Sequence, residues 1–468
     1  MQSKLTFLGA ARNVTGSRYL LETCGVKILV DCGLYQERQF SNRNWEPFPI
    51  PPNTIGSVLL THAHIDHCGL LPKLVREGFR GRIYCTTATA EIAKIILLDS
   101  AHLQEEDAEF KKRRHERERR KGAHPEIPLY TVADAKACLP LFSPVEYGNP
   151  VPICAGVEAT FHDAGHVLGS SMIQVAFGQG DEKRTIIFSG DIGRFNGAIL
   201  PDPNIFNKTD YVLIESTYGD RLHEDAASID DSLAEIVNST YKAGGNIIVP
   251  SFALQRAQEI LYHLSNLLGQ GRIPHLKVFL DSPMAVSITE VFRRHCELLE
   301  HEADKQLCLS GDLFDFPGFK MVQTIDESKA LNNINGTVMI IAGAGMCNGG
   351  RIKHHLVNNI FRPESTILFI GYQAAGTLGR QIIDGAHKVR ILGQQYPVRA
   401  KIVQIHGFSA HADKEELFRW LSGLVKAPRR VFVTHGESEV AEKFSEFLKE
   451  KTGWEVSVPE YGAEVLLD

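Results

Sequence analysis

His62-Ala63-His64-Ile65-Asp66-His67 is the stretch that decides how this chain is interpreted, because it holds four metal-capable side chains within six residues. It directly follows the apolar run at 57–61. In extended backbone, residues two apart point the same way, so the first two histidines can face one ion together. The aspartate and the last histidine lie one turn further on and can face a second ion. Imidazole and carboxylate groups suit zinc or a similar divalent metal.

Further candidate ligands follow other strand-like segments of the chain. Ligands at the carboxyl ends of strands converge on one rim of a sheet, where a rigid scaffold can hold them. A two-metal site also needs a carboxylate between ions that lie about 3.5–4 Å apart. The chain supplies such a set in His62, His64, Asp66, His67, His166, Asp191 and His435. The alternative, a polar turn with scattered histidines, does not account for these downstream partners.

Composition predicts a globular protein of two domains. The chain has 468 residues, which is more than one ordinary core accommodates, and 43% of them are hydrophobic. No apolar run reaches the roughly 18 residues of a membrane span, and the first residues carry no secretory pattern. The nine cysteines form no CxxC pair. We therefore expect free thiols in a reducing compartment, and a cytoplasmic protein.

The net charge of −6 does not indicate a nucleic-acid partner, although basic residues cluster at 111–121. This cluster follows an acidic, helical stretch. Two interpretations remain open for it, a solvated helix face and a contact with a phosphate backbone.

The pattern of predicted secondary structure differs between two parts of the chain. In the first 200 residues, short β-rich runs such as 27–31 and 185–189 alternate with predicted helices at 70–77, 89–98 and 103–121. From about 220 to 395, buried strand-like runs alternate with predicted helices, which favours a parallel sheet. The last stretch of the chain, after about residue 395, has the same pattern as the first 200 residues.

The motifs HAHIDH, GHVLGS, SGDIG and VTHGE resemble those of the metallo-β-lactamase fold. Glu215 in IESTYGDR and His411 in GFSAHAD resemble the additional motifs of its β-CASP branch. That branch includes the RNA-cleaving subunit of the polyadenylation machinery and its bacterial and archaeal relatives. The resemblance implies an α/β protein, with a metallo-β-lactamase αββα sandwich formed by 1–219 and 396–468. A doubly wound parallel-sheet β-CASP domain is then inserted at 220–395, and no leading KH domains are expected.

The resemblance also implies a role for each ligand of two zinc ions, although manganese could occupy the same set. One zinc is held by His62, His64 and His166. The other is held by Asp66, His67 and His435, and Asp191 bridges the two. Asp31 is expected to orient a ligand through a hydrogen bond.

The implied activity is that of a zinc-dependent ribonuclease that hydrolyses phosphodiester bonds of single-stranded RNA through a hydroxide activated by two metals. The catalytic residues are then Asp66, Glu215 and His411. The imidazole of His411 would protonate the departing ribose oxygen, and Glu215 would fix its tautomer and favour its protonated form.

Glycine-rich loops and basic residues of the second half suggest contacts to phosphate groups. The candidates for substrate binding are Ser251, Arg256, Arg351, Thr377, Arg380 and Ser409. Three alternatives remain: a DNA nuclease of the same branch, a non-catalytic RNA-processing scaffold, and a hydrolase of smaller molecules. A homodimer is also left open, as is the choice between internal and terminal cleavage.

Overall fold

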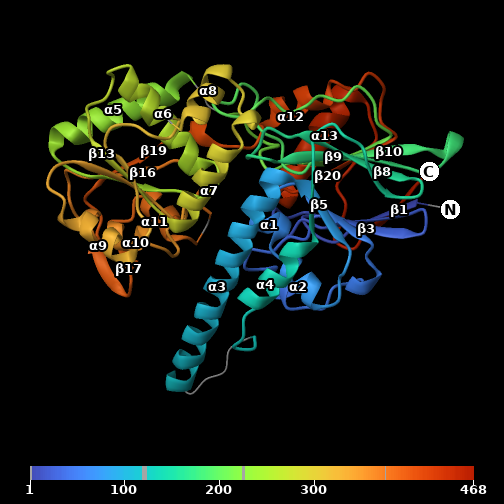
Figure 1. The fold of residues 1–468 in the computed structure, drawn as a ribbon, viewed down its shortest axis with the longest axis horizontal. Coiled ribbons are helices and arrows are strands. Elements are labelled where there is room, and N and C mark those ends of the chain that lie inside the picture. The colour runs from blue at the N-terminus through green and yellow to red at the C-terminus, as the bar shows by residue number, and fades with distance from the viewer. Residues whose placement is uncertain (1–2, 119–123, 224–226, 312, 375) are drawn as a thin grey trace. The chain divides into compact units, whose positions relative to one another are not determined.

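The computed structural model describes residues 3–118, 124–223, 227–311, 313–374 and 376–468. Its chain divides into two compact units (Figure 1). Unit 1 comprises 1–197, 201–222 and 411–468, and unit 2 comprises 198–200 and 223–410. Among the described residues, no helix is long and apolar enough to cross a membrane.

Unit 1 contains two seven-stranded sheets. The first sheet has the order β22-β1-β2-β3-β4-β5-β6, and the second has the order β21-β20-β11-β10-β9-β8-β7. The first is built from β1 (Ser3–Phe7), β2 (Tyr19–Thr23), β3 (Val26–Val30), β4 (Ser57–Leu59), β5 (Arg82–Thr86), β6 (Phe142–Val145) and β22 (Glu464–Leu467). The second is built from β7 (Val151–Cys154), β8 (Val157–Asp163), β9 (Ser171–Phe177), β10 (Arg184–Phe188), β11 (Tyr211–Glu215), β20 (Arg430–Thr434) and β21 (Val456–Ser457).

The core of unit 1 lies between these sheets because their strands alternate in side-chain polarity. In β8, Val157, Ala159 and Phe161 are buried, whereas the residues between them are more exposed. Phe7 of the first sheet contacts Phe432 of the second, with ring centroids 5.3 Å apart. Apolar side chains on the other side of the second sheet pack against α12 (Lys414–Leu421) and α13 (Ser438–Thr452).

Helices also cover the first sheet. They are α1 (Ile65–Cys68), α2 (Leu71–Arg76), α3 (Thr87–Glu118) and α4 (Val132–Cys138). Helix α3 packs against β5 and β6 through its first part, and Figure 1 shows its second part running out past the sheets. The layers are therefore helix, sheet, sheet and helix, as the predicted αββα sandwich requires.

The sequence predicts two helices where the structure has the single helix α3. No proline or glycine interrupts 87–118, so the backbone has no reason to break. The exposed charges on its second part form pairs one turn apart, including Arg113 with Glu109 and Arg114 with Glu118. These pairs fit the interpretation as a solvated helix face. Residues 119–121 of the basic cluster lie outside the described residues.

Unit 2 contains a six-stranded sheet of order β14-β13-β15-β12-β16-β19, in which every neighbouring pair is parallel. Its strands are β12 (Ile247–Pro250), β13 (Lys277–Asp281), β14 (Phe319–Met321), β15 (Val338–Ala342), β16 (Thr366–Phe369) and β19 (Lys401–Gln404). A hairpin of β17 (Lys388–Ile391) and β18 (Gln394–Pro397) is separate from this sheet. The helices are α5 (Ala227–Ala243), α6 (Arg256–Gly269), α7 (Pro283–Arg294), α8 (Glu302–Ser310), α9 (Ile325–Ala330), α10 (Ile352–Asn359) and α11 (Leu378–Ile383).

Strand β12, inside this sheet, is apolar and buried throughout, because a parallel sheet covered on both faces has no solvent side. Strand β19 pairs with β16, so the compact unit extends to residue 410, past the boundary at 395/396 that the sequence suggests. The assignment of domain limits remains a prediction.

One prediction about the cysteines is wrong. Cys296 and Cys308 form a disulfide, with their Cα atoms 5.6 Å apart, whereas the sequence suggested free thiols throughout. The chain turns back after α7, so α8 brings the second cysteine beside the first. This contact between two structural elements leaves no motif in the sequence. The other seven cysteines are free, and Cys68, next to the HAHIDH motif, is buried.

A buried polar network at the end of β13 stabilises unit 2. The carboxylate of Asp281 has no exposed surface and lies 2.6 Å from both Arg351 Nη1 and His355 Nε2. Removing one partner of a buried ion pair leaves the other charges without compensation. We expect Asp281→Ala to lower the free energy of unfolding by about 3–5 kcal/mol in urea denaturation. Asp326→Ala, which removes a carboxylate that is 98% exposed, should change it by less than about 0.5 kcal/mol.

Candidate metal centre and its histidine–glutamate pair

Two groups of metal-capable atoms lie at the carboxyl-end rim of the sheets of unit 1. The structure places His62, His64, His166 and Asp191 in one group. It places Asp66, His67 and His435 in the other. Within each group the candidate ligand atoms lie within 4.8 Å of one another. The seven residues that the sequence proposes as ligands are therefore brought together from four separate segments.

The first group is a compact set of imidazoles. His64 Nδ1 lies 3.0 Å from His62 Nε2 and 3.2 Å from His166 Nε2. Burial lowers the pKa of all three rings, that of His64 to about 3. The rings are therefore neutral at physiological pH, which is the form that binds a metal ion.

The second group combines imidazoles with a carboxylate. His67 Nε2 lies 3.1 Å from His435 Nε2, and His435 Nε2 lies 3.6 Å from Asp66 Oδ2. Burial opposes protonation of His435, but the charges of Asp191 and Asp66 raise its pKa to about 8. The pKa of His67 is likewise raised, since burial is outweighed by Asp191 and Asp31. The buried negative charge of this group therefore favours positive charge beside it, which a bound metal ion would supply.

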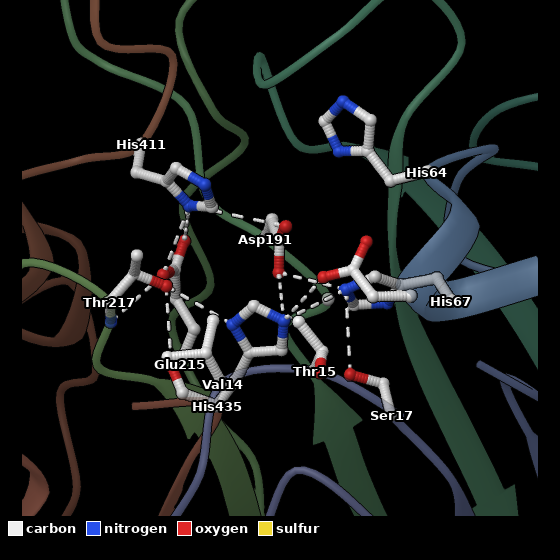
Figure 2. Close-up of polar contacts among 12 residues, drawn as sticks. Val14, Thr15, Ser17, His64, His67, Asp191, Glu215, Thr217, His411 and His435 are labelled. Carbon is white, nitrogen blue, oxygen red and sulfur yellow. Dashed lines mark hydrogen bonds and ion pairs between the residues drawn. The ribbon is translucent and has the colours of Figure 1, made fainter. Parts of the chain in front are cut away.

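Asp191 lies between the two groups. Its Oδ2 atom is 3.4 Å from His62 Nε2 and 3.5 Å from His166 Nε2. Its Oδ1 atom is 3.3 Å from His67 Nε2 and 3.6 Å from His435 Nε2. Figure 2 shows this carboxylate at the centre of the polar contacts. The two oxygens of one side chain thus face different groups.

The loops that carry these side chains approach one another closely. Gly190, just before Asp191, has φ +54°, and a Cβ atom there would lie 2.8 Å from Thr61 Cβ. A Cβ atom on Gly33 would lie 1.6 Å from the carbonyl oxygen of Asp66. Side chains at these two glycines would push the loops apart.

Three of the candidate histidine ligands are oriented by further hydrogen bonds. His67 Nδ1 lies 2.8 Å from Asp31 Oδ2, as the sequence suggests for this aspartate. His435 Nδ1 lies 3.1 Å from Thr217 Oγ1, and His62 Nδ1 lies 3.0 Å from Thr61 Oγ1. Sequence reasoning missed both threonines. Their only signal was position, since Thr61 directly precedes His62 and Thr217 lies two residues after Glu215.

The chemistry of the donor set fits divalent metal. Asp31, Asp191 and Glu215 are at most 2% exposed, and among the described residues none of them, nor Asp66, forms an ion pair with Lys or Arg. Asp191 Oδ1 is buried and accepts no hydrogen bond from the described residues. Burial alone would raise the pKa of Asp191, but neighbouring histidine charge holds it well below its ordinary value. A buried carboxylate surrounded by imidazoles without a cationic side chain is suited to ligating a metal ion.

A separate pair lies beside this centre. His411 Nδ1 is 3.1 Å from Glu215 Oε1 and 3.2 Å from Glu215 Oε2, and both side chains appear in Figure 2. Glu215 ends β11 and is held in place by the backbone N–H of Ile192, which donates to Oε1 at 2.7 Å. His411 precedes α12, whose first turn is capped by Asp413. Burial opposes protonation of His411, but Glu215 raises its pKa.

Comparison with known proteins identifies the family. Family models match a metallo-β-lactamase superfamily domain at residues 20–216, a Beta-Casp domain at 257–382, and a Zn-dependent metallo-hydrolase RNA specificity domain at 395–459. The chain is 38% identical to a protein of Thermus thermophilus named as a ribonuclease, over 98% of each chain. The chain belongs to the β-CASP family of the metallo-β-lactamase fold.

Other members of the β-CASP family are also similar. A protein of Methanocaldococcus jannaschii named as transcription termination factor FttA is 30% identical over 95% of this chain and 69% of its own length. A crystal structure of an Enterococcus faecalis protein of unknown function matches 100% of both chains, with a TM-score of 0.57 and 12% identity. That last match shows the fold alone.

Several of the residues that the sequence proposes as substrate contacts of this β-CASP protein form ion pairs or hydrogen bonds with other residues of unit 2. Arg351 pairs with buried Asp281, Arg256 Nη1 lies 2.9 Å from Glu259 Oε2, and Arg380 Nη2 lies 2.8 Å from Asp384 Oδ1. Thr377 caps α11, and the hydroxyl of Ser251 donates to the carbonyl of Phe252. Ser409 Oγ makes no hydrogen bond among the described residues. The role of these six residues in binding substrate remains a prediction.

Proposed function

We propose that this chain is a zinc-dependent ribonuclease that hydrolyses phosphodiester bonds of single-stranded RNA at the centre around Asp191. The observation that carries the proposal is the shared carboxylate. Asp191 faces His62 and His166 with one oxygen and His67 and His435 with the other. This arrangement suits two ions a short distance apart, with Asp191 between them. The ribonuclease name of a relative that matches the full chain supports RNA as the substrate.

A pair of zinc ions in this set would lower the pKa of water and neutralise charge on a phosphate group. The residues of the chain supply what remains. Because the Glu215 carboxylate accepts from Nδ1 of His411, Nε2 is the nitrogen that delivers a proton to the departing ribose oxygen. The raised pKa of His411 keeps more of the ring protonated near neutral pH.

A cytoplasmic location remains part of the proposal. The seven free cysteines fit a reducing compartment, whereas the Cys296–Cys308 disulfide is the feature that does not.

The substrate class is tested with purified protein and three probes: labelled single-stranded RNA, DNA of the same sequence, and a generic thioester. We expect cleavage of RNA alone, loss of cleavage after treatment with a chelator, and recovery when zinc is added back. Cleavage of DNA at a rate comparable to that of RNA would instead identify a DNA nuclease. Metal binding without cleavage of any probe would identify a scaffold.

A further inference from the structure

The second part of α3 has an inner and an outer face. Ala101, Ala108 and His115, which are seven residues apart, are buried. Residues from the described segment that begins at 124 contact this inner face: the backbone N–H of Val132 donates to Glu105, and Glu126 Oε1 lies 2.6 Å from His115 Nδ1. Residues that lie on the opposite side of a helix with this spacing point to solvent. We define the outer face of α3 as Leu103, Glu106, Asp107, Phe110, Arg113 and Arg114.

Two large apolar side chains stand on this outer face. Leu103 is 54% exposed and Phe110 is 62% exposed. They lie seven residues apart, so they occupy the same stripe of the helix. Single exposed apolar residues are ordinary, but two on one stripe of a helix that runs out past its sheets form a surface for a partner (Figure 1).

The charges of the outer face are arranged symmetrically about Phe110. Two acids, Glu106 and Asp107, precede it by four and three residues. Two arginines, Arg113 and Arg114, follow it by three and four. In an antiparallel pair of identical helices centred on residue 110, position 110 + n faces position 110 − n. Glu106 then meets Arg114 of the second copy, and Asp107 meets Arg113.

We propose that the outer face of α3 binds the same face of a second copy of this chain, antiparallel, about a twofold axis at Phe110. Such a contact is self-complementary, as a twofold interface requires. The two Phe110 rings meet at the axis. Leu103 lies opposite position 117, where the aliphatic stem of Arg117 covers it.

The present partners of these charges do not oppose the contact. Asp107 and Arg113 form pairs within the helix, with Lys111 and Glu109, and the four side chains are 56–78% exposed. Exposed pairs of this kind contribute little, so exchanging them for pairs across the interface costs little. The segment from Leu103 to Arg117 is about 22 Å long, and one helix pair of that length is a small interface. We therefore expect a concentration-dependent dimer rather than a permanent one.

RNA is the competing occupant, since basic residues and an exposed ring are typical of single-strand binding surfaces. The arrangement of charges on the outer face favours a second copy. From 103 to 121 the chain carries six acidic residues and eight lysines and arginines, so the number of charges alone does not decide between the two occupants. Glu106 and Asp107 also lie on the same face as the arginines, where they would repel a phosphate backbone.

Charge exchange in the full chain tests the proposal by sedimentation velocity over a range of concentrations. The parent should dimerise, and R113E/R114E and E106R/D107R should each weaken self-association by about tenfold or more, because like charges then face each other. An equimolar mixture of the two variants should associate again, since every facing pair becomes attractive. Circular dichroism checks that α3 remains helical. A merely destabilised helix would not be rescued by mixing.

Cysteine crosslinking tests the position of the axis. Phe110→Cys should form a covalent dimer rapidly under mild oxidation, because equivalent residues meet at a twofold axis. Val425→Cys is the matched control, since Val425 is 82% exposed and lies far along the chain from α3. Equal crosslinking of the two variants would overturn the proposal.

Two further outcomes overturn it. One is a parent chain that stays monomeric at every concentration, or a mixture of charge variants that fails to associate. The other is a monomeric parent whose binding to a labelled single-stranded RNA weakens about tenfold in R113E/R114E, which would assign the outer face of α3 to RNA. Cleavage activity does not enter either readout, so the test is independent of the proposed function.

Discussion

Replacing His411 by alanine is expected to slow RNA cleavage by about 10²–10⁴-fold while the protein keeps its full metal content. His411 pairs with Glu215 and belongs to neither of the two groups of candidate ligands described above. Its imidazole lies 4.0 Å from Asp191 Oδ2, which places it next to the centre. Loss of a proton donor beside an intact metal site should therefore lower the turnover number without altering metal binding. Single-turnover cleavage and elemental analysis of the same preparation measure the two effects.

His275→Ala is the matched control, because it removes an exposed imidazole from unit 2 and should leave both quantities unchanged. Glu215→Gln gives a second test. The amide keeps an oxygen for the backbone N–H of Ile192 but removes the negative charge that raises the pKa of His411. Cleavage should then fall less than in His411→Ala. If His411→Ala lost metal, the residue would be a ligand and its assignment as a proton donor would be wrong.

The sequence predicted the fold because its signals are local. Short strand patterns such as 185–189 and 247–250, each contained within a few residues, predicted an α/β protein with a parallel sheet in its second part, and the resemblance to the family implied the αββα sandwich. The ligand set was also readable, since HAHIDH is contiguous and the family motifs fix the order of the others. The structure brings all seven proposed ligands into two adjoining groups.

Contacts between distant segments were not readable. The hydroxyl of Thr217 meets His435 from a residue 218 positions away, and neither residue type announces the pairing. Asp281 pairs with Arg351 and His355, which lie at the start of α10, about 70 residues further along the chain. Because this pairing cannot be seen in the sequence, Arg351 was proposed as a phosphate contact. The disulfide between Cys296 and Cys308 has the same cause, because it depends on how α8 folds back after α7.

Replacing Asp191 by alanine is expected to abolish both metal binding and cleavage. One of its oxygens faces each ligand group, and the three-histidine group has no other acid. Without them, neutral imidazoles alone would have to compensate the charge of a divalent ion in the buried three-histidine group. Elemental analysis after extensive dialysis should find a greatly reduced metal content. RNA cleavage should fall to the level of the parent protein treated with a chelator.

Asp191→Asn separates charge from geometry in this experiment. Asparagine has the same shape and retains one oxygen, so the surrounding loops, which pack tightly at Gly190, are not disturbed. A carboxylate between two ions uses both oxygens and its negative charge, and the amide supplies neither in full. We therefore expect Asp191→Asn to bind metal more weakly than the parent and to cleave RNA far more slowly, with an unchanged circular dichroism spectrum. An asparagine variant that retained two tightly bound ions would show that Asp191 does not bridge them.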